Sequence, residues 1–140
     1  MKTIGWFVVA VLALPAGPAL AQSKACSKAD EAAAEKALDG VVNWQLMSKA
    51  WKQFRHCDSG ATEEMFTDAF MRLAVEWKHV DELAALSRAD PEFKAFVKRH
   101  VTNPKFRDDA QSVYSRAKMS CPPDQAAFCA ELAEMAQWAQ

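Results

Sequence analysis

The sequence predicts an all-α fold, a compact bundle of six or seven short helices braced by two disulfides. Three observations support this class. The chain of 140 residues is rich in Ala, Leu, Lys, Glu and Met, which favour helix. No alternating strand pattern extends beyond four residues. The four cysteines are an even number, as expected of paired thiols in an oxidising compartment.

Residues 1–21 have the pattern of a cleaved secretory signal peptide. Lys2 supplies a positive charge, Ile4 to Leu14 form an apolar run, and residues 19–21 (Ala-Leu-Ala) form a small-x-small cleavage pattern. We expect cleavage after Ala21, which leaves residues 22–140 as a single helical domain in the periplasm or outside the cell. The alternative is an uncleaved membrane anchor. The apolar run spans only ~16 Å as a helix, about half the hydrocarbon core, so the signal peptide is favoured over the anchor. Once it is cleaved, no stable membrane span is expected.

The charge of the mature chain is nearly balanced. The whole sequence has 17 basic and 18 acidic side chains, and removal of Lys2 leaves a net charge of about −2. This balance gives no reason to expect nucleic acid as a partner.

Four cysteines lie in the mature part of the chain, and we expect two disulfides. Their spacings form no C-x-x-C pair and no C-x-x-C-H haem site, which argues against a zinc ribbon or a redox motif. We favour Cys57–Cys121 together with Cys26–Cys129 among the three possible connectivities. Cys57 and Cys121 each follow a helix end, and the other two belong to the outer helices, which would then contact each other.

The first half of the domain contains two helices and one longer helical segment. A helix over about 28–38 begins after Ser27, a favourable N-cap, and ends at Asp39-Gly40. A second helix covers about 42–56. The segment 62–87 keeps one apolar face for five turns, and it forms either one long helix or two that meet near His79.

Prolines mark the helix boundaries in the second half of the domain. Asp90 and Pro91 suit the N-cap and first position of a short helix that ends at Asn103-Pro104. A helix over about 107–119 ends at Cys121-Pro122-Pro123. Asp124 caps the last helix. Its predicted inward residues are Phe128, Leu132, Met135 and, as a further candidate, Trp138.

One helical face of the segment 42–56 is aromatic. Trp44, Met47, Trp51 and Phe54 recur at helical spacing, and the favoured interpretation is a core stripe. The alternative is the lining of a groove for an apolar ligand, since Trp and Met are also common at binding surfaces.

No catalytic, metal-binding or cofactor-binding motif is present in the sequence. The three histidines lack metal-ligand spacing, and His100 falls on an apolar face, where a hydrogen-bonded core histidine is expected. His56 beside Cys57 and Asp58 could suggest a nucleophile, but a disulfide-bonded cysteine provides no thiolate. We therefore expect a protein that is not an enzyme and needs no cofactor.

Two surface segments are candidates for partner binding. The first is a loop held by a disulfide, from Asp58 to Glu64, which includes Glu63. The second is a basic segment without intervening acids, which contains Lys94, Lys98, Arg99, Lys105 and Arg107. A solvated face is the ordinary interpretation of such a run, and a docking patch for an acidic partner or anionic headgroups is the functional one.

The sequence thus favours a small periplasmic or secreted protein that binds another protein, as an inhibitor, an immunity protein or an adaptor. The layout is similar to that of some periplasmic immunity proteins, which neutralise toxins delivered by neighbouring bacteria. The alternative is a carrier that holds a small apolar ligand between its helices. The sequence makes no prediction of the partner's identity or of the oligomeric state.

Overall fold

A computed structural model describes residues 24–139, and the predicted signal peptide, residues 1–21, lies outside this part. Residues 24–139 form seven α-helices and three short 3-10 helices, with no strand. The predicted all-α bundle with two disulfides is confirmed. The helices are α1 (Lys28–Asp39), α2 (Trp44–Phe54), η1 (Arg55–Cys57), α3 (Gly60–Glu76), α4 (Val80–Ala89), α5 (Pro91–Val101), η2 (Pro104–Phe106), α6 (Arg107–Met119), η3 (Pro123–Gln125) and α7 (Ala126–Gln137).

Polar caps begin α1 and α5 at the predicted residues. Ser27 accepts a hydrogen bond from the backbone N–H of Asp30, whose carboxylate accepts one from the Ser27 backbone N–H, so the two residues form a capping box. The Asp90 carboxylate accepts hydrogen bonds from the backbone N–H groups of Glu92 and Phe93. These caps satisfy N–H groups that have no partner within their own helix, and so they fix where α1 and α5 begin.

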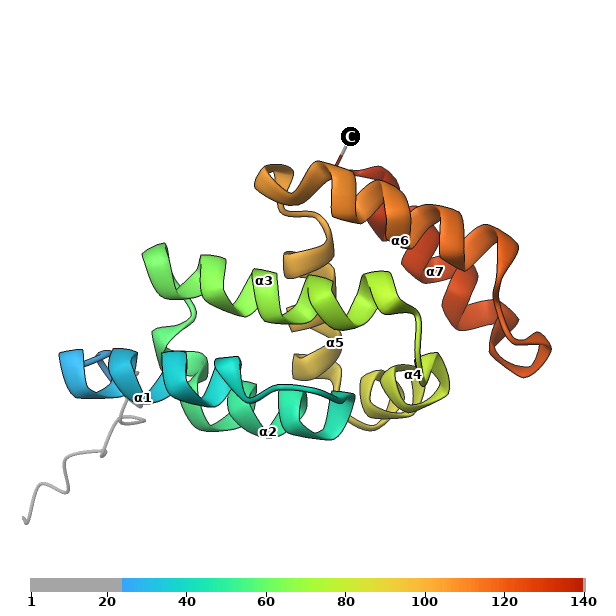
Figure 1. The fold of residues 1–140 in the computed structure, drawn as a ribbon. Coiled ribbons are helices and arrows are strands. Elements are labelled where there is room, and N and C mark those ends of the chain that lie inside the picture. The colour runs from blue at the N-terminus through green and yellow to red at the C-terminus, as the bar shows by residue number, and fades with distance from the viewer. Residues whose placement is uncertain (1–23, 140) are drawn as a thin grey trace, which may run out of the picture.

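α3 is the central element of the bundle (Figure 1). α1 and α2 pack along one side of it, and α5 crosses behind it in this view. α4 packs against α2 and α5. α6 and α7 run side by side as a helical hairpin beyond α3. The connections between successive helices are short, which keeps neighbours in sequence close in space.

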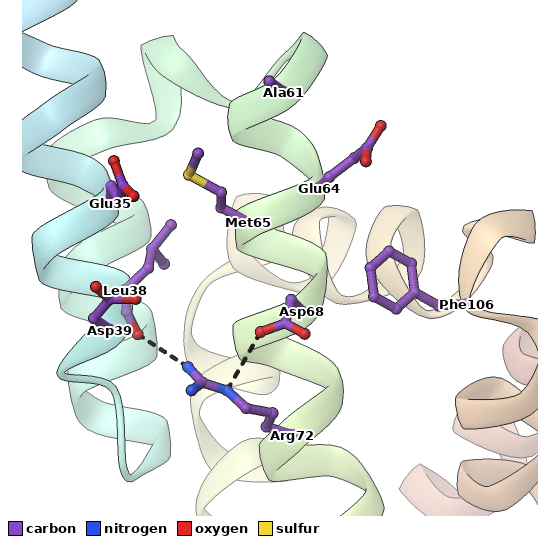
Figure 2. Close-up of a pocket in the computed structure, with 9 residues that line it drawn as sticks. All are labelled: Glu35, Leu38, Asp39, Ala61, Glu64, Met65, Asp68, Arg72 and Phe106. Carbon is purple, nitrogen blue, oxygen red and sulfur yellow. Dashed lines mark hydrogen bonds and ion pairs between the residues drawn. The ribbon is translucent and has the colours of Figure 1, made fainter.

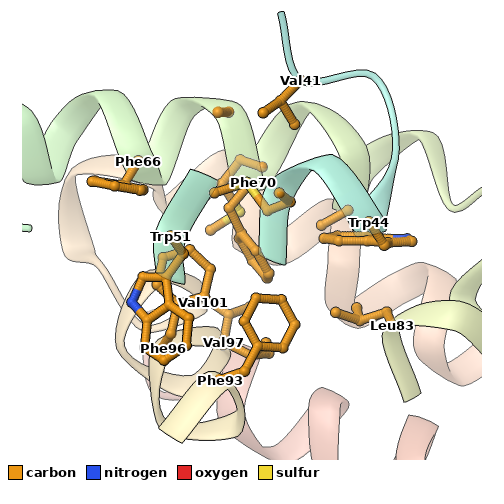
Figure 3. Close-up of a cluster of buried hydrophobic side chains, with 14 of the residues drawn as sticks. Val41, Trp44, Trp51, Phe66, Phe70, Leu83, Phe93, Phe96, Val97 and Val101 are labelled. Carbon is orange, nitrogen blue, oxygen red and sulfur yellow. The ribbon is translucent and has the colours of Figure 1, made fainter. Parts of the chain in front are cut away.

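Aromatic side chains of α2, α3 and α5 form the core (Figure 3). The Trp51 ring centroid lies 5.6 Å from that of Phe93 and 5.5 Å from that of Phe96. Trp44 lies 5.6 Å from Phe70. Aromatic pairs at such distances stabilise the fold beyond the gain from area burial. The predicted core stripe on α2 is confirmed, because all four of its members are buried: Trp44, Met47, Trp51 and Phe54.

The segment 62–87 is two helices. Trp77 and His79 between α3 and α4 adopt left-handed backbone conformations, with φ of 58° and 52°. The Trp77 indole N–H donates to the Ser120 carbonyl oxygen at 2.9 Å. The Trp77 ring packs against a small cluster formed by α6 and α7. The break lies near His79, so the second of the two alternatives for this segment is confirmed.

The predicted disulfide connectivity is wrong. Cys26 is joined to Cys57 and Cys121 to Cys129, with Cα–Cα distances of 4.8 and 6.1 Å. α1 packs against η1, which carries Cys57, and Cys121 and Cys129 flank the turn between α6 and α7. The prediction assumed that the outer helices contact each other. They pack instead against different neighbours, so each disulfide closes a local loop.

The last helix also differs from expectation at its end. Leu132 is buried and Met135 packs against the core, but Trp138 is 78% exposed. Trp138 is the C-cap of α7, and its side chain faces solvent although the next residue, Ala139, is buried in the core. Of the helices in residues 24–139, none is both long and apolar enough to cross a membrane.

Candidate functional site

The two segments predicted to bind a partner lie next to each other. Asp58 precedes α3, Glu64 lies near the start of that helix, and the basic segment extends over α5, η2 and the first residue of α6. Arg99 forms an ion pair with Asp58, and Lys105 forms one with Glu64. Part of the charge of each segment is therefore already paired with the other segment within the folded protein.

The basic segment is largely neutralised within the protein. Besides the pairs of Arg99 and Lys105, Lys94 Nζ lies 2.6 Å from Glu131 Oε1 of α7. Lys98 and Arg107 are exposed and make no ion pair with any residue in the described range 24–139. The sequence could not reveal these pairs, because their acidic partners come from other helices.

A buried polar network lies beneath this face. His100 Nε2 lies 3.1 Å from Asp58 Oδ2, and His100 Nδ1 lies 2.7 Å from Thr67 Oγ1. A carboxylate only accepts hydrogen bonds, so we infer that the Nε2 atom of His100 carries a proton. The Asn103 side-chain amide donates to Thr67 Oγ1 at 3.3 Å. The network thus ties α5 to α3 and to the residue after the Cys57 turn.

The order of carboxylate, imidazole and hydroxyl in this network matches that of a hydrolase nucleophile. Thr67 and His100 have no exposed surface, however, so no substrate reaches the hydroxyl in this conformation. The Thr67 hydroxyl also lies 2.9 Å from the Glu63 carbonyl oxygen within its own helix. The predicted role of His100 as a hydrogen-bonded core residue is confirmed, and its partners at positions 58 and 67 had no signal in the sequence.

A shallow hollow of about 450 Å³ lies between α2 and α5. Its charged lining is already paired, since Arg55 pairs with Glu92 and Arg99 with Asp58. The Arg55 guanidinium also lies 5.7 Å from the ring centroid of Trp51, within the range of a cation–π contact. The charged side chains that line this hollow are therefore not free to pair with a ligand.

A second hollow, of about 420 Å³, lies over α3 (Figure 2). We call it the acidic hollow. Its rim carries four carboxylates and one guanidinium, and its remaining lining is apolar. The lining residues are Glu35, Leu38 and Asp39 of α1, Ala61, Glu64, Met65, Asp68 and Arg72 of α3, and Phe106 of η2.

Arg72 fixes the position of α1 beside α3 at this hollow. Its Nη2 donates to the Leu38 carbonyl oxygen at 3.1 Å, and its Nε lies 3.6 Å from Asp68 Oδ2 (Figure 2). The Leu38 carbonyl oxygen at the end of α1 also accepts from the Val41 backbone N–H at 3.1 Å, so the guanidinium adds a bond from α3 to a helix end that is already capped. The Arg72 side chain therefore has a structural role at the hollow, joining α1 to α3.

Two rim carboxylates are unengaged. Glu35 and Asp39 are exposed, and neither forms an ion pair with a residue of the described chain. Sequence reasoning identified Glu64 but missed the other residues of the hollow. The spacing of Glu35 and Asp39, and of Glu64 and Asp68, by one helical turn was the available signal. Their placement around a common hollow depends on the packing of α1 against α3.

No three His, Cys, Asp or Glu side chains within residues 24–139 are arranged to hold a metal ion. No protein-family model matches the chain, and no curated protein or solved structure is significantly similar to it. The fold and the surface define a small, disulfide-braced helical protein with an acidic hollow over its central helix.

Proposed function

We propose that this protein acts outside the cytoplasm by binding another protein, as an inhibitor, an immunity protein or an adaptor, and without catalysis. The acidic hollow is the observation that carries the proposal. It combines an apolar floor, formed where α1 packs against α3, with two unengaged carboxylates of α1, those of Glu35 and Asp39. Protein-binding surfaces commonly combine an apolar centre with a charged rim.

The scaffold supports this proposal. α1 is tied by the disulfide from Cys26 to Cys57 and by the bond from Arg72 to the Leu38 carbonyl oxygen. A binding surface held rigid before association loses less conformational entropy when the complex forms. Two disulfides are also compatible with a periplasmic or secreted protein, which is the location that the proposal requires.

The alternative function, a carrier of a small apolar ligand, has less support. The aromatic stripe that would line its pocket is packed into the core by side chains of α3 and α5. A ligand there would have to displace native contacts.

Affinity capture tests the proposed function. The protein with both disulfides intact is immobilised and exposed to periplasmic and secreted extracts of its source organism at several salt concentrations. We expect one protein to be retained in stoichiometric amount, and to re-form a complex of defined mass when the two purified proteins are mixed. A bait that is reduced and denatured is the control.

Retention of no stoichiometric protein at any salt concentration would contradict the proposal. Denaturing extraction of the purified protein, followed by mass spectrometry, would then test the carrier function. A carrier should release a small apolar compound in proportion to the protein.

A further inference from the structure

We propose that the acidic hollow binds a basic amphipathic helix of the partner protein. This inference rests on the proposed function and identifies the surface and the chemistry of the segment that it would bind.

Two of the four rim carboxylates, those of Glu35 and Asp39, form no ion pair within residues 24–139, whereas the other two pair with Lys105 and Arg72. Glu35 and Asp39 lie one turn apart on α1, and Glu64 and Asp68 lie one turn apart on α3. Like charges at this spacing destabilise a helix. Asp39 is moreover the last residue of α1, where the helix dipole disfavours a carboxylate. A lysine-rich or arginine-rich segment complements such a rim.

The floor of the hollow requires that the occupant be partly apolar. Leu38 is buried, and Met65 and Phe106 are partly buried and pack against the core beneath the hollow. Met side chains adapt readily to the shape of a partner. The aliphatic stems of lysine and arginine can lie on this floor while their charged ends reach the rim. A segment with one apolar and one basic face satisfies both requirements.

The shape of the site favours a helix over other peptide conformations. The lining residues of α3 lie from Ala61 to Arg72, which is about three turns or ~16 Å of helix. Strand addition needs a sheet edge, and residues 24–139 contain no strand. Polyproline recognition uses grooves lined with aromatic rings, whereas Phe106 is the one aromatic residue lining this hollow. Phosphorylated or acidic segments would be repelled by the rim.

A peptide titration tests the inference. The probe is a synthetic amphipathic peptide of about 18 residues, with Lys on one face and Leu on the other, and its counterpart has Glu at every Lys position. Binding to the full ¹⁵N-labelled protein is followed by two-dimensional NMR. We expect the Lys peptide to shift amide signals of residues 35–39 and 61–72, and the Glu peptide to shift none.

Two double variants with equal charge change provide the comparison. Glu35→Gln with Asp39→Asn removes the unengaged rim charges, and Asp81→Asn with Glu134→Gln removes two exposed acids outside the hollow. The first should weaken binding of the Lys peptide about tenfold, and the second should leave it unchanged. Ala61→Trp, at an exposed position in the hollow, should block binding even if the first variant folds poorly.

The outcomes distinguish this inference from the proposed function. Absence of shifts with the Lys peptide, shifts confined to other helices, or equal weakening in both double variants would overturn the inference. A stoichiometric partner captured by wild type and by all three variants with equal affinity would likewise overturn it, while leaving the proposed function intact. Failure of the wild-type protein to capture any partner would instead contradict the proposed function.

Discussion

Burial determines how much an individual charged residue contributes to the free energy of unfolding of this protein. Arg99 with Asp58 and Arg55 with Glu92 are both arginine–carboxylate pairs. The Asp58 side chain is 1% exposed, whereas the Glu92 side chain is 70% exposed. Removing the buried Asp58 carboxylate leaves the buried His100 without its hydrogen-bond acceptor in a medium of low polarity, whereas water replaces the partner of an exposed pair.

Substitutions of these two carboxylates should therefore differ strongly. Asp58→Ala should lower the free energy of unfolding by about 3 kcal/mol, because His100 Nε2 loses its acceptor inside the core. Glu92→Ala, the matched control, should lower it by no more than about 1 kcal/mol. Urea unfolding at neutral pH measures both values. Equal losses would mean that the network around His100 does not stabilise the fold.

The N-cap of α5 predicts a pH dependence of stability. Hydrogen bonds from the Phe93 and Glu92 backbone N–H groups and from the Lys52 side chain lower the pKa of Asp90 below its usual 3.8. A carboxyl group whose pKa is lowered by folding stabilises the protein above its unfolded pKa, and this contribution is lost as the pH falls through the folded pKa.

Asp90→Ala should lower the free energy of unfolding by about 1 kcal/mol at pH 7. The difference from wild type should persist down to about pH 4 and shrink at lower pH, since Asp90 becomes protonated in both states. Asn43→Ala is the control, because Asn43 caps α2 by accepting from the Leu46 N–H and does not titrate. A loss at Asp90 that stays constant to pH 2 would show that its charge is unimportant.

At the scale of elements, Trp77 and His79 turn the chain between α3 and α4 through left-handed backbone conformations. Side-chain contacts offset the conformational cost at Trp77 but not at His79. His79 is exposed and its side chain makes no capping hydrogen bond, whereas Trp77 bonds to Ser120 and packs against α6 and α7. A left-handed conformation is costly for a residue with a Cβ atom and costs glycine little.

His79→Gly should therefore leave stability unchanged or raise it by up to about 1 kcal/mol. Trp77→Gly should lower it by about 2 kcal/mol or more, since the packed indole is lost. Thermal or urea unfolding of both variants provides the comparison. A marked destabilisation by His79→Gly would show that its side chain has a structural role.

The two disulfides should differ in their effect on stability. Each stabilises by restricting the unfolded chain, and the restriction grows with loop length. The sequence separation is 31 residues for Cys26–Cys57 and 8 for Cys121–Cys129. Replacing the first pair by Ala should cost about 4 kcal/mol and replacing the second about 2.5 kcal/mol. Non-reducing peptide mapping should yield these two linked pairs, and a Cys57–Cys121 peptide would contradict the fold.

Helix positions could be predicted from the sequence because their causes are local. The caps at Ser27 and Asp90, Pro91 at the first turn of α5, and the aromatic stripe of α2 act within a few residues. The disulfide connectivity could not be predicted, because it depends on which helices pack together. Composition and periodicity carry no information on that choice.

At the scale of the whole molecule, the candidate site arises from the packing of three elements that are distant in sequence. α1, α3 and η2 each contribute part of the acidic hollow, and none of them is distinctive alone. Of its nine lining residues, only Glu64 was predicted, and for a different reason: its place in a loop that is mostly helix in the structure. Three of the five residues of the predicted basic segment are paired within the protein, and the acidic hollow is the surface that combines unpaired charge with an apolar floor.

The most direct test of the central claim is parallel capture with three immobilised baits. They are wild type, Glu35→Gln with Asp39→Asn, and the control Asp81→Asn with Glu134→Gln, each disulfide-bonded and exposed to the same extracellular and periplasmic extracts. We predict that wild type and the control retain the same protein in stoichiometric amount, and that the rim variant retains about a tenth as much at limiting partner concentration. Failure of all three baits to retain a stoichiometric protein would contradict the claim that this protein acts by binding another protein.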